Sequence, residues 1–156
     1  MFEEAYIYYN LALEIVPRDQ RKKLQNQLAI CLKVEGMILK RRKKYADANQ
    51  RFDQALNACT DDYEDRYSLI WWKSETLSDL GQFAQAKIFL EQAYSLAPKE
   101  KKKEIRNQKA LLLKKYGIEL SKGKFFLEAL AKFNEALEKC SDDYDQKYSL
   151  LWSVYI

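Results

Sequence analysis

The chain has 156 residues, of which 47% are hydrophobic and 32% are charged, a composition that excludes an intrinsically disordered protein. Only 4 glycines and 2 prolines are present, which argues against many turns and favours a single all-α domain. The net charge of +4 is too small to indicate nucleic-acid binding by itself.

Helix periodicity and helix-end signals divide the chain into eight predicted helices. Pro17 and Pro98 each end a helix because proline cannot continue the hydrogen-bond ladder, and Gly81 turns the chain between two others. Asp61 is the predicted N-cap of the fourth helix, with Glu64 as its capping-box partner. The predicted ranges are 2–16, 19–42, 45–59, 61–80, 83–97, 100–121, 126–140 and 143–156.

The second half of the chain repeats the first at an offset of 81 residues, without a gap. Gly36 matches Gly117, and Cys59 matches Cys140. Longer matches pair Asn26-Gln27 with Asn107-Gln108, Asp61-Asp62-Tyr63 with Asp142-Asp143-Tyr144, and Trp71 with Trp152. This pattern indicates the tandem duplication of a block that itself holds two units.

The stretch 77–98 shows what the unit is. Gly81, Phe83, Ala86, Ala93 and Pro98, in this order, resemble the second half of a tetratricopeptide repeat, a helix-turn-helix unit of about 34 residues. The resemblance implies an α-solenoid of antiparallel helix pairs wound into a right-handed superhelix. Full units would span 29–62, 67–100 and 110–143, with partial units at 1–19 and 144–156, all in one repeat domain.

Each full unit has a small residue in its first helix, at Gly36, Ser74 or Gly117. Glycine inside a helix costs about 1 kcal/mol relative to alanine, so two equivalent glycines predict a close helix–helix contact. The second helices carry paired alanines, namely Ala48 and Ala55, Ala86 and Ala93, and Ala129 and Ala136.

Both ends of the chain fall inside a unit, which predicts exposed apolar surface there, because repeat arrays normally need polar caps. We therefore expect a piece of a longer array, or end-to-end pairing with a second copy or with another chain.

No catalytic or metal-binding pattern is present in the sequence. The chain has no histidine, the commonest general base and metal ligand, and its three cysteines lack the spacing of a metal site. It also has no glycine-rich phosphate loop. The acidic pairs at 61–62 and 142–143 are interpreted as helix caps. We therefore expect a protein that is not an enzyme and that needs no cofactor or metal.

In tetratricopeptide arrays the first helices line a concave groove in which a partner's peptide or helix docks. The resemblance assigns partner-binding positions on these helices to Lys33, Met37, Arg41, Trp72, Glu75, Lys114, Lys115 and Ile118. Basic groups dominate the groove positions, which predicts an acidic or amphipathic partner segment. The carboxylate grip that some family members use is not expected, because Met37 and Trp72 stand where that grip has asparagines.

The tryptophans divide into two groups. Trp71 and Trp152 are equivalent and are expected to pack between neighbouring first helices, whereas Trp72 is matched by Ser153. Trp72 is therefore the better candidate for a contact in the groove.

Two alternatives to a protein-binding scaffold stay open. One is a nucleic-acid-associated module that uses the basic surface, such as the run Lys40-Arg41-Arg42-Lys43-Lys44, which also suits nuclear targeting or solvated surface at a helix end. It is the less favoured reading, because aromatic residues interleaved with the charges are not established. The other is a self-assembling repeat array.

The sequence also bears on location. No apolar run approaches the ~18 residues of a membrane span, and the N-terminus, Met-Phe-Glu-Glu-Ala, is not a secretory signal. Three widely spaced cysteines indicate unpaired thiols in a reducing compartment. We expect an intracellular protein without membrane contact, cytoplasmic or nuclear.

Overall fold

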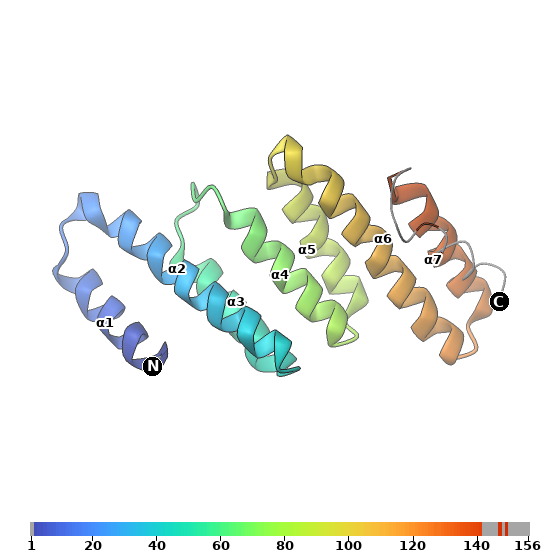
Figure 1. Cartoon of the computed structure of the whole chain (residues 1–156), viewed down its shortest axis with the longest axis horizontal. Helices are drawn as coiled ribbons and strands as arrows, with labels where there is room; N and C mark the ends of the chain where they lie inside the picture. The colour runs from blue at the N-terminus through green and yellow to red at the C-terminus, as the bar shows by residue number, and fades with distance from the viewer. Residues whose placement is uncertain (1, 142–146, 148, 150–156) are drawn as a thin grey trace.

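The computed structural model describes residues 2–141, 147 and 149, and over this range the chain forms seven helices and no strand. The helices follow one another in a row, each beside the next in sequence (Figure 1). Their bounds are α1 (Phe2–Ile15), α2 (Arg18–Arg41), α3 (Tyr45–Ala58), α4 (Arg66–Asp79), α5 (Phe83–Leu96), α6 (Lys99–Lys122) and α7 (Phe126–Lys139). The predicted all-α solenoid is confirmed, while the handedness of its superhelix stays a prediction.

Three helix pairs build the array, namely α2 with α3, α4 with α5, and α6 with α7. Contacts between α3 and α4 and between α5 and α6 join one pair to the next. Helix α4 also contacts both α2 and α6, so the three first helices of the pairs lie side by side. They form one face of the solenoid, and this face positions the candidate site.

Six of the predicted helices agree with the structure to within one residue at each end. The fourth was wrong, because α4 begins at Arg66, after Asp65 and without a side-chain cap. Two tight turns occupy the intervening segment, in which the amide of Tyr63 donates to the Thr60 carbonyl and that of Arg66 to the Tyr63 carbonyl. The equivalent Asp142-Asp143 pair and most of the eighth predicted helix lie outside the described residues.

The predicted close contacts at the small residues are confirmed. A Cβ atom built on Gly36 would lie 2.7 Å from the ring of Phe52, and one on Gly117 would lie 2.5 Å from the ring of Phe133. At the equivalent place in the middle pair, Ser74 donates to the carbonyl of Ala86 over 2.7 Å. Leu90 stands there in place of the phenylalanine. The six paired alanines are all buried.

Residues one block apart have matching surroundings, as the duplication predicts. The Asn26 Oδ1 atom accepts hydrogen bonds from the Thr60 amide at 3.0 Å and the Thr60 hydroxyl at 3.2 Å. In the second block, the Asn107 Oδ1 atom accepts from the Ser141 amide and hydroxyl, at 3.0 and 2.9 Å. Each asparagine thereby ties the end of one second helix to its first helix.

The turn between the two helices of each pair needs one residue in the left-handed region. Gly81 supplies it in the middle pair with a φ of 77°, whereas Lys43 and Lys124 adopt φ values of 59° and 66°. Such backbone is strained for a lysine, which has a Cβ atom.

Exposed apolar side chains gather on the two outermost helices of the described range. On α1, Tyr8 and Ile15 are 72% and 83% exposed, and on α7 Leu127 is 85% exposed. The apolar surface predicted for the N-terminal end is therefore present on α1, while the C-terminal end lies outside the described residues and end-to-end pairing stays a prediction.

Candidate partner-binding groove

A cavity of about 210 Å³ opens on the face formed by the first helices. Its walls come mainly from α4 and α6, with single residues added by α2 and α5. We refer to it as the central cavity, and it is lined by Lys40, Ser74, Glu75, Ser78, Leu90, Gln108, Leu111, Leu112 and Lys115.

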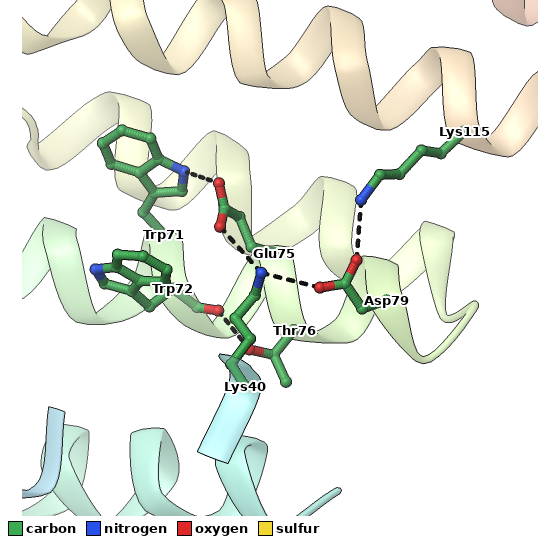
Figure 2. A network of polar contacts seen from close by, with 7 residues as sticks. All are labelled: Lys40, Trp71, Trp72, Glu75, Thr76, Asp79 and Lys115. Atoms are coloured by element: carbon green, nitrogen blue, oxygen red, sulfur yellow. Dashed lines mark hydrogen bonds and ion pairs between the residues drawn. The ribbon is translucent and has the colours of Figure 1, made fainter. Parts of the chain in front are cut away.

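A network of ion pairs runs along the central cavity and joins all three first helices (Figure 2). The Lys40 Nζ atom lies 2.9 Å from Asp79 and 3.4 Å from Glu75, and the Lys115 Nζ atom lies 2.9 Å from Asp79. The indole of Trp71 donates to Glu75 over 3.2 Å. The Asp79 carboxylate on α4 therefore links α2 to α6.

The environment keeps the central members of this network ionised. Burial opposes the charge on Asp79, but hydrogen bonds from Lys115 and Lys40 outweigh it, so the carboxyl pKa lies below its ordinary value. Burial also opposes the charge on Lys40, but contacts with Asp79 and Glu75 outweigh it and raise the pKa of the ammonium.

The structure brings two of the predicted groove residues, Glu75 and Lys115, together at the central cavity. The Lys33 ammonium instead bonds to the Asp65 carboxylate and, at 3.4 Å, to the Ser68 hydroxyl. The Lys114 ammonium bonds to the Ser149 hydroxyl. Because Lys33, Lys40 and Lys115 all pair with carboxylates, the groove is less basic than its sequence suggests.

The other predicted residues differ in exposure. Met37 is half-buried on α2, and Ile118 is 38% exposed on α6. Arg41 is exposed at the end of α2 and forms no ion pair with the described residues.

Trp72, the candidate for a contact in the groove, takes part in packing between helices. Its ring stacks on Phe52 of α3, with 6.4 Å between the ring centroids and 15° between the planes. The Lys40 ammonium lies 5.8 Å from the centre of the Trp72 ring. Trp72 therefore helps to join α4 to the preceding pair, and its role in partner binding stays a prediction. Trp71 packs against the buried cluster around Leu77 and Leu90, and Trp152 lies outside the described residues.

Sequence reasoning missed two polar residues of the central cavity, Ser78 and Gln108. Ser78 is 7% exposed, and its hydroxyl has no hydrogen-bond partner within the described part of the chain. One signal was available, because Ser78 lies four residues after Ser74 and three after Glu75, and therefore on the same helical face.

Two exposed apolar residues on α2 were also missed. Ile30 and Val34 on α2 are 44% and 42% exposed, and they stand 81 residues before Leu111 and Lys115 of the central cavity. The internal repeat itself was the signal that points to these positions.

The described residues contain no group of three or more histidine, cysteine, aspartate or glutamate side chains placed to hold a metal ion. Among their helices, none combines the length and the apolarity needed to cross a membrane.

Comparison with known proteins gave one match. The family model described as tetratricopeptide repeat matches residues 67–100, which contain α4 and α5. These are also the bounds predicted for the middle unit, while the division of the rest of the chain stays a prediction. Neither the curated proteins nor the solved structures gave a match.

Proposed function

Because this chain is a tetratricopeptide-like repeat protein, we propose that it binds a peptide or helical segment of a partner protein across α2, α4 and α6. Proteins built from repeats of this family generally act as scaffolds that bind other proteins. The observation that carries the proposal is the central cavity, which opens on the face where the three first helices lie side by side.

The chemistry of this face favours an amphipathic partner segment. Apolar side chains stand at Ile30, Val34 and Met37 on α2, and at Leu111 and Ile118 on α6. A helix or strand with one apolar face would bury them, which is how such grooves gain affinity. Acidic side chains of the partner would be attracted to Arg41, which has no acidic partner among the described residues.

The proposal is tested by capturing partners from an extract of the source organism with matched variants. Ile118→Glu places a charge on the groove face, and Ile88→Glu places the same charge on α5, where Ile88 is 58% exposed. Proteins retained by the wild type and by Ile88→Glu, but lost from Ile118→Glu, would support binding in the groove. Equal retention by both variants would contradict it.

The proposed location is intracellular. All three cysteines are free thiols, which suits a reducing compartment. Nuclear and cytoplasmic locations are distinguished by imaging the tagged chain in its own cells.

A further inference from the structure

A second cavity, of about 180 Å³, is formed by residues of α5, α6 and α7. It opens on a different side of α6 from the groove. Arg106 lines the second cavity and Gln108 lines the central one, and residues two positions apart project in nearly opposite directions from a helix. We call the second cavity the basic cavity, and its charged residues are Glu91, Arg106, Lys109 and Lys139.

The charges of the basic cavity do not cancel. Its one carboxylate, Glu91, pairs with Lys109. Arg106 and Lys139 are both exposed, and neither forms an ion pair with the described residues. Two positive charges are therefore left unmatched among the lining residues, and such charges attract an acidic partner.

The internal duplication shows that the fold does not need these cations. The first block has the equivalent cavity, of about 350 Å³, formed by residues of α1, α2 and α3. Its residues at the three cationic positions are Gln25, Leu28 and Ala58. None of the three is charged, although the same helix packing surrounds them. The positive charges of the basic cavity therefore need an explanation other than packing.

The basic cavity also offers apolar surface. The half-buried Tyr94 contributes its ring, and the lysines and the arginine contribute the methylene groups of their stems. The volume is below the range of about 300–1,000 Å³ typical of small-molecule sites, which favours a single side chain as the occupant. Tyr94 is the one aromatic residue of this lining, and the Lys102 ammonium lies 5.1 Å from its ring centre. A series of stacking rings, as single-stranded nucleic acid requires, is therefore not present in the lining.

The cations follow one line along α6. Lys102, Arg106 and Lys109 stand at positions i, i+4 and i+7, and therefore share one side of the helix over about 10 Å. Lys139 adds a cation from α7. A protein segment with several carboxylates and one apolar side chain matches both the line of charges and the cavity.

We propose that the basic cavity binds an acidic segment of a partner protein. The segment places one apolar side chain in the cavity and its carboxylates beside Arg106, Lys139 and Lys102. This surface is separate from the groove, so the inference goes beyond the proposed function and does not depend on it.

The test uses peptides as the probe. Random displayed peptides are selected on the whole chain, and the affinities of the selected peptides are measured by fluorescence anisotropy. The basic-cavity variant is Arg106→Gln with Lys139→Ala, which introduces the residues of the first block. The matched control is Arg18→Gln with Lys23→Ala, the same replacements at two exposed cations of α2. Thermal unfolding of each variant shows whether it remains folded.

We expect one class of selected peptides to carry several carboxylates around an apolar residue. The basic-cavity variant should weaken their binding about three- to tenfold, because two ion pairs at an exposed site are lost. The control variant and Ile118→Glu should leave their affinity unchanged. Added salt should weaken binding to the wild type, and replacing the glutamates of a peptide by glutamines should remove the difference between wild type and variant.

The other outcomes would overturn the inference. Acidic peptides that lose affinity equally in the basic-cavity variant and in its control would respond only to net charge. A selection in which no peptide responds to the basic-cavity variant would exclude the site, and peptides lost only with Ile118→Glu would then still support the groove. A single-stranded RNA oligonucleotide is titrated in parallel. RNA binding that falls in the basic-cavity variant, where no peptide responds, would assign the surface to nucleic acid instead.

Discussion

The ring of Phe133 lies against the backbone of Gly117, so close that a Cβ atom at residue 117 would come within 2.5 Å of the ring. Gly36 and Phe52 repeat this contact in the first block, with the same spacing of 16 residues. In the middle pair the same two positions hold Ser74 and Leu90. The three pairs thus use a glycine with a phenylalanine, or a serine with a leucine.

This relationship predicts that Gly117→Ala destabilises the protein although alanine is the better helix former. Overpacking against a buried ring costs about 1–3 kcal/mol, which offsets the gain of about 1 kcal/mol in helix propensity. Urea unfolding measures the difference. The double variant Gly117→Ser, Phe133→Leu should be more stable than Gly117→Ser alone, because it reproduces the middle pair. No recovery in the double variant would contradict this account.

Two serines one turn apart should respond in opposite ways to alanine. Ser74→Ala removes a buried hydrogen bond to Ala86 and should lower the free energy of unfolding by about 1 kcal/mol. Ser78→Ala removes an unpaired buried hydroxyl and should leave stability unchanged or raise it by up to about 1 kcal/mol. Thermal and urea unfolding give both values. A clear loss of stability in Ser78→Ala would show that its hydroxyl already has a partner in the free protein.

Replacing a lysine by glycine in the turn within a helix pair should stabilise the protein. Lys43 and Lys124 hold the left-handed backbone that Gly81 supplies in the middle pair. Lys124→Gly should stabilise the protein by roughly 0.5–1 kcal/mol, since the relief of strain exceeds the added entropy of the unfolded chain. Gly81→Lys should have the opposite effect. Both residues are exposed, so neither substitution removes core packing. Urea unfolding followed by circular dichroism therefore measures the effect of the backbone conformation on stability.

The Asp79 network predicts acid sensitivity. The pKa of this carboxyl is lower in the folded protein than its ordinary value of 3.8, so the unfolded chain binds the proton more tightly. The stabilisation is therefore complete above about pH 4 and disappears as the pH falls through the folded pKa. Near neutral pH, Asp79→Asn should cost about 1–3 kcal/mol, because two half-buried lysine contacts lose their charge partner.

The matched control for this prediction is Glu119→Gln. Glu119 pairs with Lys122 on the surface of α6, and its side chain is 52% exposed. Its loss should cost no more than about 0.5 kcal/mol at any pH. If the deficit of Asp79→Asn near neutral pH persisted undiminished in acid, the network would not be its source.

Much of the fold could be predicted because the helix ends carry local signals. Pro17 and Pro98 separate helices whose bounds agree with the structure to within one residue. The start of α4 could not be predicted in this way. Asp61, the predicted cap, is fully exposed and lies 3.9 Å from Arg66, while the carboxylate of Asp62 binds Lys22, which lies 40 residues earlier in the chain. The chain makes two tight turns before α4 begins, and the local pattern of residues does not show them.

The candidate site could also be predicted only in part from the sequence. The internal repeat placed Lys33 and Lys114 on the first helices, but it did not show that Lys33 meets Asp65 or that Lys114 meets Ser149. Trp72 carried no local sign that its ring would stack on Phe52. Whether the Ser78 hydroxyl finds a hydrogen-bond partner depends on all the side chains packed around it. The order of residue types along the chain does not contain that information.

The position of Asp79 also has a mechanical consequence. In a stacked array each repeat touches only its neighbours, so bending accumulates from one joint to the next. Asp79 is bonded to a lysine from the preceding pair and to one from the following pair, and therefore spans two joints at once. Loss of this carboxylate would weaken the contacts of α4 with both α2 and α6. The distance between α2 and α6 would then vary more during thermal motion.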